Sequence, residues 1–144
     1  MTANLTFSNE TLSGATLESR GSRLAGGLTE LGLGEGDAIA VLLHNRPAYA
    51  DVMMACRIGG FYHCAINWHF RSSEIDYLLK DSSARALIVE EALLPEAEGV
   101  VPEGMPVLVV GATTDQFPDY EDWLSRQAPY DGPARAPRGL MPYT

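Results

Sequence analysis

The sequence predicts an α/β fold in which strands and helices alternate around a mainly parallel sheet. Several short apolar runs lack the polar alternation of a half-exposed strand, which is typical of parallel strands covered on both faces. Amphipathic segments with helical spacing separate these runs along the chain. Glycine, proline and capping residues stand at the junctions between the two kinds of segment. Together these features favour right-handed strand–helix–strand crossovers.

The N-terminal residues are predicted to form a hairpin followed by a helix. "LTF" at residues 5–7 and "TLS" at residues 11–13 are separated by "SNE", which places Asn9 in the turn. Ser13 is the expected N-cap of the helix, and Gly32 is placed to end it. The apolar face of this helix consists of Leu17, Leu24, Leu28 and Leu31.

Four buried strands are predicted at residues 38–44, 61–66, 86–90 and 106–111, which read AIAVLLH, FYHCAI, ALIVE and PVLVVG. The first three should lie parallel and adjacent in one sheet. Pro47 fits the first position of the helix between the first two strands. The buried side of this helix is predicted to carry Tyr49, Val52, Met53 and Cys56.

Two further helices are predicted from their capping residues. Ser72 or Ser73 should cap a helix over residues 72–82, and Asp119 should cap a short helix over residues 119–127. The charged stretch at residues 90–104 is interpreted as a surface excursion with one helical turn.

The composition limits the classes of function. Lys and Arg total 10 against 19 Asp and Glu, so the net charge of −9 disfavours nucleic acid and anionic lipid as partners. No apolar run approaches the roughly 18 residues that a membrane span needs. The first residues lack the pattern of a signal peptide, and the two cysteines make no disulfide framework. We therefore expect a soluble protein of the cytoplasm.

No group of residues within the chain predicts an active site. "GLGEGD" at residues 32–37 resembles a dinucleotide-binding glycine loop, but it follows a helix and precedes a strand, the reverse of the required order. We interpret it as a helix end and a turn. The first buried strand ends in His44 and Asn45 with no aspartate, which disfavours a phosphoacceptor receiver domain.

The candidate metal ligands lack the spacing of known sites, and we expect no metal site. Structural zinc sites pair their ligands at short, regular intervals. The four soft ligands that lie near one another in sequence are Cys56, His63, Cys64 and His69. The acidic residues at positions 115–122 likewise lack the spacing and the glycine of a calcium loop.

Residues 24–89 resemble the N-terminal part of the adenylate-forming acyl-CoA synthetases. The matching features, in order, are "LGLGEGD" at residues 31–37, "NRP" at 45–47, the glycine pair at 59–60, Asn67 and "SSE" at 72–74. "INWHF" at residues 66–70 is most similar to the fatty-acyl and bile-acid-type CoA ligases. This resemblance is more specific than any single motif, because order and spacing hold over the whole stretch.

The resemblance also implies a domain organisation. Residues 1–128 would form the N-terminal α/β part of the AMP-binding large domain, and residues 129–139 a Pro/Ala/Gly-rich linker. Residues 140–144 would begin the strand that leads, in this family, into a Ser/Thr/Gly-rich phosphate loop. We therefore expect an N-terminal fragment that is inactive by itself.

The activity implied for the whole protein is carboxylate adenylation with ATP and Mg, followed by thioester formation with CoA. Thr144 would stand at the edge of the ATP phosphate loop. His69 matches a position where some family members carry an arginine near the CoA nucleotide phosphates. Because histidine is mostly neutral at pH 7, Arg71 would supply the charge there; alternatively, His69 merely ends a strand in a surface loop.

The resemblance places no catalytic residue and no metal ligand of the family inside the chain. The expected partners are a small carboxylic acid, ATP and CoA, and a homodimer is a further candidate assembly. Two alternatives stay open: a non-catalytic α/β interaction module derived from a ligase, and an unrelated receiver-like or nucleotide-binding domain. The acyl substrate is not indicated by these residues.

Overall fold

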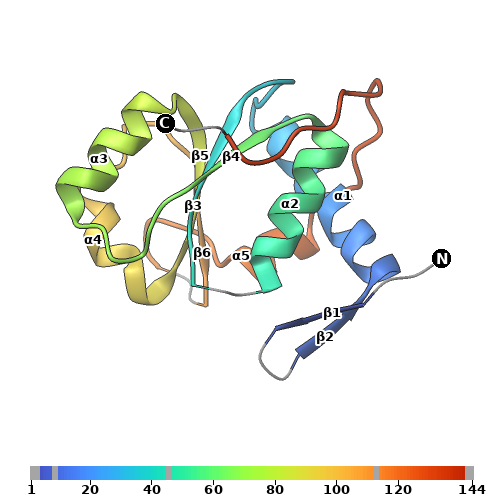
Figure 1. Cartoon of the computed structure of the whole chain (residues 1–144), viewed down its shortest axis with the longest axis horizontal. Helices are drawn as coiled ribbons and strands as arrows, with labels where there is room; N and C mark the ends of the chain where they lie inside the picture. Colours follow the sequence, from blue (N-terminus) through green and yellow to red (C-terminus); the bar gives the residue numbers. More distant parts are fainter. Residues whose placement is uncertain (1–3, 8–9, 45–46, 112–113, 142–144) are drawn as a thin grey trace.

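The predicted α/β fold is confirmed. A computed structural model of the chain describes residues 4–7, 10–44, 47–111 and 114–141, with side chains from Ser13 onward. Four strands form one sheet in the order β4-β3-β5-β6, and every neighbouring pair is parallel (Figure 1). The strands are β3 (Ala38–Leu42), β4 (Tyr62–Ala65), β5 (Ala84–Glu90) and β6 (Val107–Val110).

Helices cover both faces of this sheet, which makes a three-layer arrangement (Figure 1). One face packs against α1 (Gly14–Glu30), α2 (Pro47–Gly59) and α5 (Tyr120–Ser125). The other face packs against α3 (Ser72–Asp81) and α4 (Leu94–Glu98), which a 3₁₀ turn (Glu91–Leu93) connects to β5. Alternate residues of β3, β5 and β6 enter the two cores, as their apolar runs predict, whereas β4 lies at the edge of the sheet and its Ala65 is exposed.

The N-terminal hairpin matches the prediction, and so does its helix except at Leu31, which is the C-cap residue and is 41% exposed instead of belonging to the apolar face. β1 (Asn4–Phe7) pairs antiparallel with β2 (Glu10–Ser13), and Asn9 lies outside the described residues. Figure 1 shows this hairpin to one side of the sheet, in contact with the start of α1. The Ser13 hydroxyl accepts a hydrogen bond from the Thr16 backbone N–H at 3.1 Å, which caps the helix.

The glycine-rich segment at residues 32–37 is a helix end and a turn, as interpreted. Gly32 has a φ of 105°, a conformation that costs glycine least. The Asp37 carboxylate then accepts a hydrogen bond from the Gly34 backbone N–H at 2.7 Å. This turn delivers the chain from α1 into β3.

Besides Leu31, three local expectations are wrong. The N-cap of α3 is Arg71, whose backbone N–H donates to the Glu74 carboxylate, while the Ser72 hydroxyl donates to the Glu96 carbonyl instead of capping. Met53 is 41% exposed and does not belong to the buried side of α2. Residues 90–104 are not only a surface excursion, since Leu94 and Ala97 of α4 are buried in the core.

The segment after α5 returns along α1 and α2 to the β4 edge of the sheet. The Tyr130 backbone N–H donates to the Ser22 carbonyl at 3.0 Å, and the Arg135 guanidinium donates to the Gly59 carbonyl at 3.0 Å. Leu140 then forms a parallel bridge with His63 of β4. The division into a domain up to residue 128, a linker and a strand from residue 140 stays a prediction.

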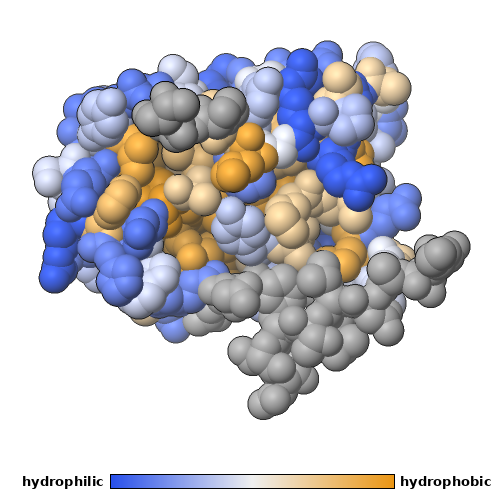
Figure 2. Space-filling view, viewed as in Figure 1, coloured by the Kyte–Doolittle hydropathy of each residue, from blue (hydrophilic) through white to orange (hydrophobic). Residues whose placement is uncertain are grey.

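Figure 2 shows apolar atoms gathered in the middle of the face that carries the β4 edge, between the helices of the two outer layers. None of the helices in the described ranges is long and apolar enough to cross a bilayer.

Candidate functional site at the carboxyl ends of the strands

Polar and aromatic side chains gather where β3, β4 and β5 end. His44 follows β3, Trp68 and His69 follow β4, and Glu90 is the last residue of β5. Because the three strands are adjacent and parallel, their carboxyl ends meet at one edge of the sheet. Ligands of open α/β sheets bind at this edge. It is therefore the first place to look for a site.

Glu90 and His44 form a pair at this edge. The Glu90 side chain is only 3% exposed, and Oε1 accepts a hydrogen bond from the His44 backbone N–H at 2.5 Å. The same oxygen lies 2.9 Å from Nδ1 of the His44 ring, whose side chain is 41% exposed. A buried carboxylate is costly unless hydrogen-bond donors surround it. His44 supplies two such donors and is held in place by them.

The His44 ring continues into an aromatic stack. The centroids of the His44 and Trp68 rings are 4.5 Å apart at an angle of 56°, and those of Trp68 and His69 are 3.6 Å apart at 32°. Trp68 is 46% exposed, so the stack lies at the surface. The Asn67 carboxamide holds the loop by accepting a hydrogen bond from the His69 backbone N–H at 2.9 Å.

The predicted site residues fall in different situations. His69 stands exposed at this edge, stacked on Trp68. Arg71 is also exposed, but its Nη1 lies 2.8 Å from Oε1 of Glu96, and this hydrogen bond lowers the pKa of the Glu96 carboxyl. Any phosphate bound by Arg71 would therefore compete with Glu96. Thr144, expected at the edge of the phosphate loop, lies outside the described residues.

Sequence reasoning missed Trp68 and the pairing of His44 with Glu90. Forty-six positions separate the two paired residues, and only the parallel pairing of β3 with β5 brings them together. One signal was present: a glutamate at the end of a buried apolar run requires a donor nearby.

The candidate soft ligands do not gather. Sγ of Cys56 lies 3.7 Å from Nδ1 of His63, and both residues are buried. Burial raises the pKa of the Cys56 thiol to about 12 and lowers the pKa of His63, so both groups are neutral at pH 7. Cys64 packs in the core on the opposite face of the sheet. Within the described ranges, no three His, Cys, Asp or Glu side chains are placed to hold a metal ion.

A second buried polar cluster joins α1, α2 and α5. Asp51 is fully buried and accepts hydrogen bonds from Nε and Nη2 of Arg20 at 3.0 and 2.9 Å. The Tyr120 hydroxyl donates to the same carboxylate at 2.8 Å. Arg20 also pairs with Glu121 at 2.6 Å. These contacts tie three helices together, and we interpret the cluster as structural.

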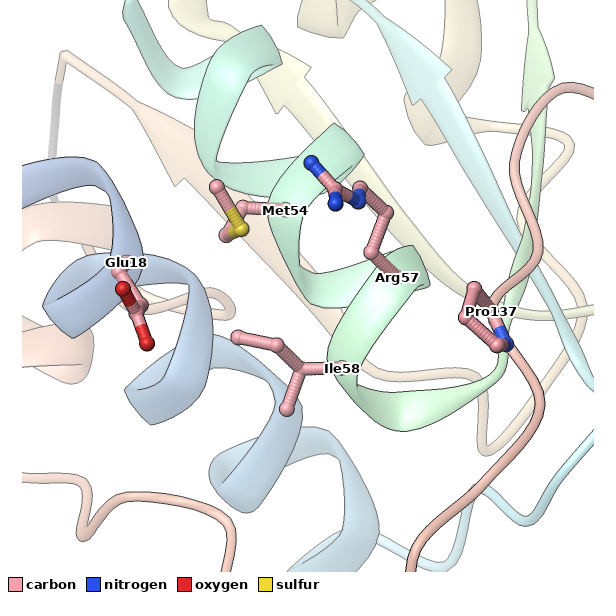
Figure 3. Close-up of a pocket in the computed structure, with 5 residues that line it drawn as sticks. All are labelled: Glu18, Met54, Arg57, Ile58 and Pro137. Carbon is pink, nitrogen blue, oxygen red and sulfur yellow. The ribbon is translucent and has the colours of Figure 1, made fainter. Parts of the chain in front are cut away.

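The pocket in Figure 3 lies between α1 and α2, away from the carboxyl ends of the strands. It has a volume of about 320 Å³ and is lined by Glu18, Met54, Arg57, Ile58 and Pro137. Met54 and Ile58 project between the helices, and Pro137 closes one side (Figure 3). No catalytic arrangement, such as a nucleophile beside a base, is present among these five residues.

Comparison with known proteins places these features in context. A sequence model of the family described as AMP-binding enzyme matches residues 2–140. A feruloyl-CoA synthase from Amycolatopsis sp is 39% identical over 74 residues, or 51% of this chain and 15% of the relative. An acetyl-coenzyme A synthetase from Rhodopirellula baltica is 31% identical over 106 residues, or 74% of this chain and 15% of the relative.

Solved structures share the fold. A benzoate CoA ligase from Burkholderia xenovorans LB400 superposes with a TM-score of 0.74 at 22% identity, over 83% of this chain and 24% of that one. An anthranilate CoA ligase in complex with anthranoyl-AMP superposes with a TM-score of 0.80 at 22% identity, over 89% of this chain and 25% of that one. The chain thus spans about a quarter or less of each of these four proteins.

Proposed function

The chain belongs to the family of AMP-binding enzymes, and we propose that it forms part of an ATP-dependent acyl-CoA synthetase, an acid–thiol ligase. The names of two relatives, a feruloyl-CoA synthase and an acetyl-coenzyme A synthetase, support this proposal. Because the chain spans 15% of their length, the activity is that of the whole protein. Whole-protein substrates would be a carboxylic acid, ATP and CoA.

The reaction would take place in two steps. The carboxylate attacks ATP with Mg present, giving an acyl-adenylate and pyrophosphate, and the CoA thiol then displaces AMP. Within the described residues, the only glycine-rich turn, residues 32–37, follows α1 and precedes β3, so it cannot present the amides of a following helix to phosphate. Residues 32–37 therefore do not fit the ATP phosphates or Mg, and we assign them no part in adenylation.

The described residues do fit the nucleotide end of CoA. The observation that carries this assignment is that an aromatic stack follows the end of β4 and that an arginine comes two residues after its last ring in the sequence. His69 offers a ring face to the adenine, and Arg71 offers a guanidinium to a phosphate after exchange with Glu96. We propose that these two residues contact CoA.

The activity is tested on the complete gene product that carries this chain. We expect carboxylate-dependent exchange of pyrophosphate into ATP, and a thioester once CoA is added. A panel of aromatic and aliphatic acids would identify the acyl group. If the folded protein catalysed no pyrophosphate exchange with any acid of the panel, the proposal would be overturned and the non-catalytic interaction module would be favoured.

The CoA contacts are tested by a double variant, His69→Ala with Arg71→Ala. We expect a higher KM for CoA and an unchanged rate of pyrophosphate exchange, because only the second step needs CoA. Arg85→Ala is the matched control, since this exposed arginine lies near the start of β5, at the opposite edge of the sheet. Equal losses in both steps would indicate misfolding, and no loss in either would leave His69 as a loop residue only.

We also propose a cytoplasmic location. Both cysteines are buried and neither forms a disulfide, which suits a reducing compartment. A homodimer would be tested by scattering on the complete protein.

A further inference from the structure

Four side chains form a continuous path from the core to the surface at the carboxyl edge of the sheet. The buried Glu90 contacts His44, the His44 ring contacts Trp68, and the Trp68 ring contacts His69. Each member comes from the end of a different strand or from the loop after β4. The exposed rings are therefore tied to the rigid part of the fold by one buried carboxylate.

The orientation of His44 is set by its contact with Glu90. One oxygen of Glu90 lies within hydrogen-bond distance of both the main-chain N–H and Nδ1 of His44. The two contacts together fix the backbone position and the ring rotation, which a single contact would not do. The Trp68 ring in turn lies against both the His44 ring and the His69 ring.

We propose that Glu90 is a positioning residue: through His44 and Trp68 it holds the His69 ring as a stacking surface for the planar base of a nucleotide ligand. This inference rests on the proposed function for the identity of the ligand, the adenine of CoA. Trp68 and His44 join the site by the same path. Glu90 itself is buried and does not touch the ligand.

The first test measures the stack without any ligand. Trp68 emission is obtained by subtracting the emission of the Trp68→Phe variant from that of the protein. The subtraction cancels the contribution of Trp123. We expect Glu90→Ala to make Trp68 more accessible to acrylamide, whereas Glu90→Gln keeps an acceptor oxygen for His44 and retains most of the protection. The control is Glu91→Gln, because Glu91 is the next residue and is exposed. Unchanged quenching in folded Glu90→Ala would overturn the proposal.

The second test measures the ligand site in the complete enzyme. Stacking of a base on an aromatic ring strengthens binding, so partial loss of orientation should raise the KM for CoA about three- to tenfold. The KM for ATP in pyrophosphate exchange should not change. Glu90→Gln should retain most of the CoA affinity. A purely structural role of Glu90 would instead affect both steps, not the CoA-dependent step alone.

A double-variant cycle separates a path from independent effects. If Glu90 acts through His44, then Glu90→Ala added to His44→Ala should raise the KM for CoA no further. Additive effects of the two changes would overturn the proposal. An enzyme with no CoA-dependent step would refute the proposed function instead, while the quenching experiment would still decide whether Glu90 orders the stack.

Discussion

Removing the Tyr120 hydroxyl tests the buried cluster that ties α1, α2 and α5 together. Tyr120 is fully buried, and its hydroxyl donates to the Asp51 carboxylate at 2.8 Å. Tyr120→Phe keeps the ring, so it opens no large cavity. Asp51 keeps its two hydrogen bonds from Arg20. The variant therefore isolates one hydrogen bond to a buried charge.

The expected loss of stability follows from that single hydrogen bond. A hydrogen bond to a charged group contributes about 1.5–3 kcal/mol to stability. For a protein of about this size, each kcal/mol lowers Tm by roughly 2–4 °C, so Tyr120→Phe should lower Tm by about 3–12 °C. The loss lies within this range because the Asp51 carboxylate stays paired with Arg20 and needs no new partner.

The measurement is urea unfolding monitored by circular dichroism, with Tyr77→Phe as the matched control. The Tyr77 side chain is 63% exposed, so losing its hydroxyl should change stability by less than about 0.5 kcal/mol. If Tyr120→Phe were as stable as the parent, the Tyr120–Asp51 hydrogen bond would not exist in solution and the cluster would not hold α5. A loss well above the range would show that Asp51 had also lost Arg20.

Three further predictions concern other parts of the chain. Gly27→Ala should destabilise by about 1–3 kcal/mol in urea unfolding, because its Cβ would lie 2.5 Å from Trp123, whereas Gly99→Ala meets no atom within 4 Å and should be neutral. Hydrogen bonding from the Ala136 backbone N–H lowers the pKa of the Glu35 carboxyl in the folded protein. The ionised Glu35 side chain therefore stabilises the fold fully above the unfolded pKa of this carboxyl, and this stabilisation is lost as the pH falls through the lower folded pKa. The stability difference between the parent and Glu35→Gln should therefore be present near pH 7, and it should shrink as the pH falls below the unfolded pKa of a glutamate and vanish below the lowered folded pKa. The 144-residue chain alone should bind ATP no more tightly than about millimolar in calorimetry, because its net charge of −9 opposes a polyanion; submillimolar binding would contradict this.

The strands and most helix boundaries could be predicted from local sequence. A parallel strand buried on both faces needs a continuous apolar run, and β3 and β5 are such runs. Ser13 and Asp119 cap α1 and α5 through their own side chains, which contact backbone groups only three residues away. Both partners of such short-range interactions lie close together in the sequence, so a single sequence suffices to predict them.

The expectations that proved wrong depend on distant contacts. The Ser72 hydroxyl does not cap α3 because the Glu96 carbonyl, 24 positions away, accepts its hydrogen bond. Met53 follows the apolar spacing of α2, yet the buried side of that helix instead carries Asp51, which Arg20 neutralises from α1. Periodicity alone cannot show that a charged residue will find its partner on another helix.

The candidate site was only partly predictable for the same reason. The resemblance to acyl-CoA synthetases pointed to His69 and Arg71, which lie close together in sequence. The support beneath them comes from other strands and could not be inferred without the sheet order. Glu90 lies at the end of β5, two strands away from β4 in the sheet.

The two buried carboxylates show why one matters for binding and the other for stability. Asp51 pairs with Arg20 and accepts a hydrogen bond from Tyr120, and these contacts connect helix to helix. Glu90 contacts His44, whose half-exposed ring continues through Trp68 to the surface. A change at Asp51 should therefore appear first in the free energy of unfolding. A change at Glu90 should also appear in the order of surface rings that a ligand can reach, which is why its effect on CoA can be measured apart from folding.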